Sequence, residues 1–208
     1  MAETNKVCFY VTGFGKFAHI LENPSSYLVR ALPAILGDCP GVELSHHEVV
    51  TVSVEHCDEA LSKIKAMISA HPGQKHMVVN FGVAASRRCF SLESVGRNIK
   101  DFRCPDENGN KFCNEKIDPE CELDCKVKTE LDLETVCKEL SARGHKVEVS
   151  CDAGEYICNY MFYRNLECFA KEKDVRSLFV HIPELRTISG PEQQAFAKDL
   201  FCELAKIF

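Results

Sequence analysis

The residue in this sequence best suited to nucleophilic chemistry is Cys158. It lies in the stretch CDAGEYICN at residues 151–159. A short β-branched run at residues 145–150 predicts a strand before it, and an apolar segment at residues 156–166 predicts a helix. Cys158 would then lie in the first turns of a helix that begins at the carboxyl edge of a sheet. Free N–H groups and the positive end of the helix dipole favour a thiolate there, and the thiolate is the nucleophilic form.

A base for this thiol is available at His181, near the end of a strand predicted at residues 176–183. A cysteine hydrolase needs a thiol, an imidazole that takes and returns its proton, and a group that orients the imidazole. The chain holds 13 cysteines and 8 histidines, so accidental pairs are common. From the residues alone, a catalytic pair and an accidental pair explain Cys158 and His181 equally well. The other histidines show no helical metal-binding spacing.

The elements that must position these residues alternate along the chain. The patterning predicts strands at residues 7–11, 48–54, 76–81, 145–150 and 176–183. It predicts helices at residues 23–35, 55–70, 131–143, 156–166 and 190–208. This alternation indicates an α/β fold, a three-layer α/β/α sandwich around a central sheet that is mostly parallel or mixed. Because ligand sites in open sheets collect at the carboxyl ends of strands, we expect Cys158 and His181 at the same edge.

Residues 83–130 are different in character, because they show no long periodic segment and become rich in Asp, Asn, Gly, Pro and Cys from residue 101 onward. A stretch of this length without regular structure is usually functional or partly mobile. No repeat or linker divides the chain, so residues 1–208 are predicted to form a single domain.

Composition excludes several classes of protein. A chain of 208 residues with 45% hydrophobic and 27% charged residues is ordinary for a soluble globular domain. The net charge of −6 and the lack of a Lys/Arg run argue against nucleic acid as a partner. The polar N-terminus is no signal peptide, and every apolar run is far shorter than the roughly 20 residues that span a bilayer. We therefore expect a cytoplasmic protein with no membrane partner.

The 13 cysteines do not indicate a disulfide framework in a chain of this size. Most are expected to be reduced thiols packed as small hydrophobic residues, among them Cys8, Cys137 and Cys202. Zinc could in principle be bound by Cys104, Cys113, Cys121 and Cys125, but their spacing contains no C-x-x-C pair. Incidental thiols are the favoured interpretation, and no metal or organic cofactor is predicted.

Four motifs in order along the chain resemble those of the type I pyroglutamyl peptidases, cysteine peptidases that remove an N-terminal pyroglutamate. VTGFGKF followed by NPS, within residues 11–25, is similar to G-F-x-x-F…N-P-S. The block from SLE at residue 91 to DFRCPD at residue 106 is similar to L-E…N…R-x-P-D. AGEYICN and FVHIP match the nucleophile motif A-G-x-[YF]-x-C-[ND] and the histidine motif F-[VI]-H-[VI]-P. The resemblance covers nearly the whole chain, and four ordered motifs are far more specific than one.

The resemblance implies catalytic roles for four residues. Cys158 would be the nucleophile and His181 the general base, with Glu93 orienting His181 and favouring its imidazolium form. Arg103 occupies the position of an arginine beside the oxyanion site, where it would act with the Cys158 backbone N–H. Without the resemblance, Glu93 would be interpreted as a surface or helix-start carboxylate and Arg103 as part of a surface salt bridge.

The resemblance also implies a substrate pocket. Pyroglutamate is a small, neutral lactam ring, so its pocket should be apolar with a few polar groups that bind the ring amide. Phe14 and Phe17 match the family's ring-binding aromatic residues, and Tyr156 and Ile157 flank the nucleophile. Asn23 could position the substrate or its loop. The expected partner is a pyroglutamyl peptide, and the chain is expected to be a monomer or a homo-oligomer.

Two departures from the family pattern support an alternative function. Lys16 and Ala18 stand where the family has Pro and Gly, and Ala18 lacks glycine's access to positive φ, so a shifted loop is expected. Residues 83–88, VAASRR, replace a more glycine-rich turn. The alternative is a catalytically weak or inactive homologue that binds pyroglutamyl or related capped peptides.

Overall fold

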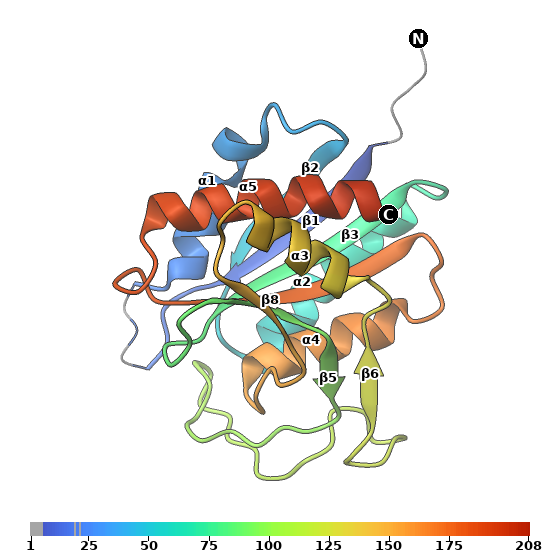
Figure 1. Cartoon of the computed structure of the whole chain (residues 1–208). Helices are drawn as coiled ribbons and strands as arrows, with labels where there is room; N and C mark the ends of the chain where they lie inside the picture. The colour runs from blue at the N-terminus through green and yellow to red at the C-terminus, as the bar shows by residue number, and fades with distance from the viewer. Residues whose placement is uncertain (1–5, 19, 21) are drawn as a thin grey trace.

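A single six-stranded sheet forms the centre of the protein (Figure 1). The computed structural model describes residues 6–18, 20 and 22–208. In spatial order the strands are β2 (Val42–Val50), β1 (Val7–Phe14), β3 (Lys75–Val83), β8 (Val175–Ile182), β4 (Phe90–Glu93) and β7 (Val147–Ser150). The first four are parallel, whereas β4 pairs antiparallel with β8 and parallel with β7. The sheet is therefore mostly parallel and mixed, as predicted.

Helices cover both faces of this sheet, which confirms the predicted three-layer architecture. One face carries α1 (Pro24–Leu36), α3 (Leu133–Ala142) and α5 (Gly190–Ile207), and the other carries α2 (Val54–Ser69) and α4 (Ile157–Phe169) (Figure 1). Every residue of β1 is buried, because its alternate side chains pack against different helical layers. Phe9 faces α5, where its ring centroid lies 4.8 Å from that of Phe201, and Tyr10 packs with Leu61 and Ile64 of α2.

Local signals explain the helix boundaries. α1 begins with Asn23 as N-cap, whose side chain accepts a hydrogen bond from the Ser25 N–H, and Pro24 follows in the first turn. α2 begins after Ser53, whose hydroxyl accepts from the His56 N–H. The predicted second strand is wrong at both ends, because β2 begins earlier at Val42 and ends at Val50. The apolar and β-branched pattern continues to residue 54, but Ser53 already caps α2.

The irregular segment was predicted to hold no long helix, and it holds none, since the described residues 83–130 form only short strands. β5 (Val95–Arg97) and β6 (Lys126–Lys128) make a separate antiparallel pair. Between them lies the buried Asn98, whose side chain makes several hydrogen bonds to the backbone of this segment. Its side chain bonds backbone groups of Ile117, Asp118, Cys121 and Glu122. This side chain replaces the missing regular hydrogen bonding.

One prediction about the cysteines is wrong. Cys202 of α5 is bonded to Cys39, just after α1, in a disulfide, whereas it was expected to be a packed thiol. The two residues are 163 positions apart, so only the packing of α1 against α5 brings them together. The other eleven cysteines are free in the described part of the chain.

None of the helices in the described residues combines the length and the apolar character that crossing a membrane requires.

Candidate active site

Cys158 lies in the first turn of α4, as predicted. Its position at the edge of the sheet is set by the strand that follows α4, and not by the strand that precedes it. The preceding strand, β7, runs antiparallel to β8 in the sheet, so its carboxyl end is not at the carboxyl edge of the parallel strands. α4 instead leads through a short connection into β8, so its first turn lies near the end of that strand. A Cβ atom on Gly82 would lie 3.0 Å from the Cys158 Sγ, and Gly82 pairs with His181 in the sheet.

The first turn of α4 provides N–H groups that no side chain caps. Tyr156 is the N-cap residue and makes no side-chain cap hydrogen bond. The initial N–H groups of a helix have no partner within the helix, and they concentrate the positive end of its dipole. Cys158 is partly buried at this position. An anion formed at its sulfur, or at a carbonyl oxygen bonded beside it, would be stabilised there.

His181 and Glu93 form a buried pair. The Nδ1 atom of His181 lies 2.7 Å from the Oε1 atom of Glu93, and the two residues are 5% and 0% exposed. In the antiparallel pairing of β4 with β8, Glu93 stands opposite Phe179 and His181 opposite Ser91. Glu93 and His181 are therefore diagonal neighbours on one face of the sheet, within reach of long side chains.

The charge environment favours the imidazolium form of His181. Burial by itself lowers the pKa of His181, but the nearby Cys158 raises it, and Glu93 raises it further through their hydrogen bond. The result is a His181 pKa of about 9. At neutral pH the His181 imidazole therefore carries a positive charge, between the sulfur of Cys158 on one side and the carboxyl group of Glu93 on the other.

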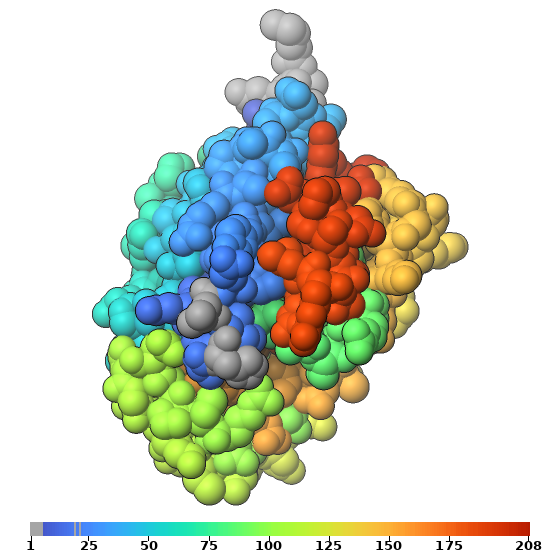
Figure 2. Space-filling view, turned by 90° about the vertical axis from the view of Figure 1, so that its left-hand side faces the viewer, coloured from blue at the N-terminus to red at the C-terminus, as the bar shows by residue number. Residues whose placement is uncertain are grey.

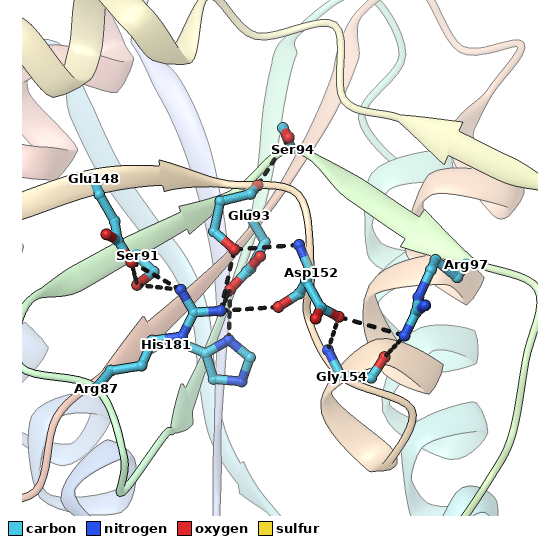
Figure 3. A network of polar contacts seen from close by, with 10 residues as sticks. Arg87, Ser91, Glu93, Ser94, Arg97, Glu148, Asp152, Gly154 and His181 are labelled. Carbon is cyan, nitrogen blue, oxygen red and sulfur yellow. Dashed lines mark hydrogen bonds and ion pairs between the residues drawn. The ribbon is translucent and has the colours of Figure 1, made fainter.

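A fourth residue, Arg87, completes this cluster and was not predicted. Its Nη2 atom lies 3.2 Å from the Oε1 atom of Glu93 (Figure 3). In the sequence, the turn that contains Arg87 stands out only as a departure from the family's glycine-rich pattern. A fully buried carboxylate needs a compensating cation. Arg87, a basic residue six positions before Glu93, could therefore have been recognised as that cation.

Arg103 is not brought to this cluster. Arg103 is exposed. No hydrogen bond or ion pair joins it to Cys158, Glu93 or His181 in the described structure. Its assignment to the oxyanion site stays a prediction.

The predicted pocket residues fall into two layers. Phe14 and Ile157 are buried in one hydrophobic cluster beneath the site, Phe14 at 3% and Ile157 at 0% exposure. Phe17 and Tyr156 are partly exposed and lie side by side, with ring centroids 6.1 Å apart and the ring planes tilted by 32°. The Tyr156 hydroxyl donates to the carbonyl of Pro105 at 3.1 Å. Phe17 and Tyr156 can therefore contact a ligand, whereas Phe14 and Ile157 support the site from below.

Asn23 positions the loop between β1 and α1. Besides capping α1, its Nδ2 atom donates to the carbonyl of Gly15 at 2.9 Å. A shifted loop was predicted because alanine lacks glycine's access to positive φ, but Ala18 itself adopts φ 47°. Its N–H donates to Glu107 Oε1 at 3.3 Å. Figure 2 shows the irregular segment, in yellow-green, packed beside this blue loop. The left-handed conformation costs an alanine about 1–2 kcal/mol.

Asn159, which follows the nucleophile in its motif, has a structural role that was not predicted. Its Oδ1 atom accepts from the Arg97 N–H, and its Nδ2 atom donates to the carbonyls of Arg97 and Ile99. The side chain is fully buried. It ties β5 to the helical turn that holds Cys158.

Metal binding was not predicted, and the described residues contain no group of three or more His, Cys, Asp or Glu side chains arranged to hold a metal ion.

The mixed sheet and its buried site define an α/β protein with a cysteine–histidine–glutamate constellation. A family model described as pyroglutamyl peptidase matches residues 6–199, and the chain belongs to this family. The pyrrolidone-carboxylate peptidase of Brevibacillus brevis is 32% identical over 193 residues, which cover 91% of this chain and 81% of that protein.

Solved structures agree on the fold. The pyrrolidone carboxyl peptidase of Fervidobacterium islandicum superposes with a TM-score of 0.85 at 22% identity, over 98% of this chain and 100% of that one. The enzyme of the same name from Thermus thermophilus superposes with a TM-score of 0.77 at 26% identity, over 92% and 97%.

Proposed function

We propose that this protein is a cysteine exopeptidase that hydrolyses the amide bond after an N-terminal pyroglutamyl residue of peptides. The observation that carries the proposal is the buried 2.7 Å contact between His181 and Glu93 beside the thiol of Cys158. Membership of the pyroglutamyl peptidase family supports the choice of substrate.

In the proposed reaction, the Cys158 thiolate attacks the carbonyl carbon of the pyroglutamyl residue. The oxyanion that forms is stabilised by N–H groups at the start of α4, including that of Cys158. The His181 imidazolium then donates its proton to the leaving amine, and the C–N bond breaks to give a thioester. Water, deprotonated by His181, attacks the thioester and releases pyroglutamate. Glu93 keeps the imidazole oriented and stabilises its positive charge throughout.

The lactam ring would bind beside the nucleophile, against the partly exposed rings of Phe17 and Tyr156. Phe14 and Ile157 form the floor beneath this surface, and Asn23 fixes the loop that carries Phe17. Arg103, which is exposed, is the proposed second contributor to the oxyanion site beside the Cys158 N–H. The mechanism needs Cys158 as a free thiol, so the reducing cytoplasm is the compartment in which we propose it acts.

A second candidate function is binding without efficient turnover. The observations that favour it are the exposed side chain of Arg103 and the strained conformation of Ala18. In this case the site would hold pyroglutamyl or related capped peptides but stabilise the oxyanion poorly.

The release of a fluorescent amine from a pyroglutamyl amide, under reducing conditions, tests the first proposal. Turnover should persist with a chelator and be lost in Cys158→Ala, whereas Cys151→Ala, which removes an exposed thiol seven positions earlier, should keep it. Turnover that survives Cys158→Ala would refute the mechanism. No turnover by the intact reduced protein, together with calorimetric binding of a pyroglutamyl peptide, would establish the second function instead.

A further inference from the structure

Arg87 connects two parts of the site that are distant in sequence (Figure 3). On one side its guanidinium contacts the Oε1 atom of Glu93 at 3.2 Å. On the other side its Nη2 atom donates to the Ser150 hydroxyl at 3.1 Å and to the Asp152 carbonyl at 2.8 Å. Ser150 is the last residue of β7, and Asp152 lies in the connection from β7 to α4, which leads to Cys158.

The contact between Arg87 and Glu93 places a positive charge beside a buried carboxylate. This carboxylate is fully buried, and its Oε1 atom is shared between His181 Nδ1 and Arg87 Nη2. Its other oxygen has no hydrogen-bond partner among the described residues. A carboxylate in such surroundings favours its neutral form unless a cation lies beside it. A neutral acid would no longer support the His181 imidazolium.

The second set of contacts requires the shape of an arginine. The Nη1 atom of Arg87 donates to Ser91 Oγ at 2.8 Å and to Glu148 Oε1 at 2.9 Å, while Nη2 serves the other three partners. A guanidinium presents these donors in one rigid plane, whereas a lysine ammonium is a compact point charge on a flexible stem. Arg87 therefore bridges β4, β7 and the β7–α4 connection at once.

We propose that Arg87 is a positioning residue for the reaction, which holds Glu93 charged behind His181 and fixes the segment that carries Cys158. This inference rests on the proposed function. The charged and titratable groups around the cluster are Glu93 from β4, Glu148 from β7, Cys158 from α4 and His181 from β8. Glu148 is half exposed, with 50% of its side chain accessible, so solvent screens its charge.

The sign of the effect follows from the net charge of the cluster. With Arg87, the thiolate, imidazolium, carboxylate and guanidinium sum to zero; without it they sum to −1. The more negative cluster binds a proton more readily, whether the proton goes to the Cys158 thiolate or to the Glu93 carboxylate. The acid limb of the activity profile should therefore move to higher pH in Arg87→Met, by about one unit. Arg87→Lys keeps the charge but loses the planar contacts, so its acid limb should stay in place while kcat falls.

Two pH profiles test this inference. The first is kcat/KM for a pyroglutamyl amide. The second is the rate at which iodoacetamide alkylates Cys158, measured by mass spectrometry of the peptide that contains Cys158. The second needs no turnover, so it remains informative if the proposed function fails. Arg88→Met is the matched control, because it removes an exposed cation one position away and should leave both profiles unchanged. Arg87→Gln provides a second neutral variant, in case Arg87→Met does not fold.

In Arg87→Met and Arg87→Gln, the acid limbs of both profiles are expected to move to higher pH. In Arg87→Lys, both acid limbs are expected to stay at the pH of the unmodified protein. An equal loss at every pH without a shift would overturn the inference, because it would show that Arg87 only supports the fold. Unchanged profiles in both neutral variants would overturn it as well.

Discussion

Replacing Glu93 by glutamine tests the electrostatic core of the site. The change removes one negative charge but keeps nearly the same shape at a fully buried position. The thiolate, imidazolium and guanidinium that remain sum to +1, so the cluster releases a proton more readily. The alkaline limb of activity, which follows the loss of the His181 proton, should therefore move to lower pH. This is opposite to the shift expected when Arg87 is neutralised.

The magnitude can be worked from the site. His181 has a pKa of about 9, and Cys158 raises it more than Glu93 does. Opposite charges at this separation shift a pKa by about 1–3 units, and the smaller contribution of Glu93 favours the lower end, so a limb near pH 8 is expected. One unit corresponds to about 1.4 kcal/mol. At pH 8.5 the protonated fraction of His181 would fall from about three-quarters to about one-quarter.

Glutamine also changes the orientation of the imidazole. Its amide can donate to Nδ1 of His181, which selects the wrong tautomer, and a loss of this kind reduces activity by about 10²–10⁴-fold at every pH. The two effects are separable, since only the protonation effect depends on pH.

An NMR titration of the His181 imidazole across pH 5–10 locates the loss of its proton, and hence the alkaline limb, even if turnover is lost. Glu148→Gln is the matched control, because Glu148 contacts Arg87 and Ser91 but not His181. The control should keep its alkaline limb near pH 9. An unchanged limb in Glu93→Gln would refute the conclusion that this carboxylate supports the imidazolium.

Three further substitutions test the packing around the site. Gly82→Ala should reduce activity at least tenfold and cost about 1–3 kcal/mol of stability, because a Cβ would lie 2.7 Å from Phe179 Cζ and 3.0 Å from Cys158 Sγ; unchanged kinetics would contradict the close approach. Asn159→Ala should cost about 2–4 kcal/mol in urea unfolding, because it removes a fully buried side chain and leaves three partly buried backbone groups of the β5 segment without partners. A cost below about 0.5 kcal/mol, the scale of an ordinary surface substitution, would show that water replaces them. Ala18→Gly should stabilise the protein by about 0.5–1 kcal/mol, because relief of the left-handed strain exceeds the entropic cost of glycine; thermal unfolding measures this, and a lower Tm than the wild type would contradict it.

Much of the framework could be predicted because its signals are local. The apolar run of β1 and the periodicity of α2 and α5 specify buried strands and amphipathic helices without reference to the rest of the chain. The strands β4, β5 and β6 are not predicted, because their three or four residues lie in the segment 83–130 that shows no periodic pattern. The direction of β7 could not be predicted either, since strand direction depends on pairing partners and not on composition.

The sequence by itself determined the chemical identities at the site. Cys158 lies in the first turn of a segment with helical character, and His181 lies near the end of an apolar strand. Glu93 stands in a motif whose order along the chain is distinctive. These are properties of short segments, and short segments carry their own patterning and propensities.

Only the tertiary structure decided which side chains meet. Glu93 reaches His181 because β4 lies antiparallel beside β8 in one particular register, and a slip of one residue would turn its side chain to the other face. The folded chain also brings Arg87 to Glu93 and leaves Arg103 exposed, although nothing in the local sequence of either arginine distinguishes the two. Contacts between distant segments depend on the packing of the whole sheet, and no local pattern encodes that packing.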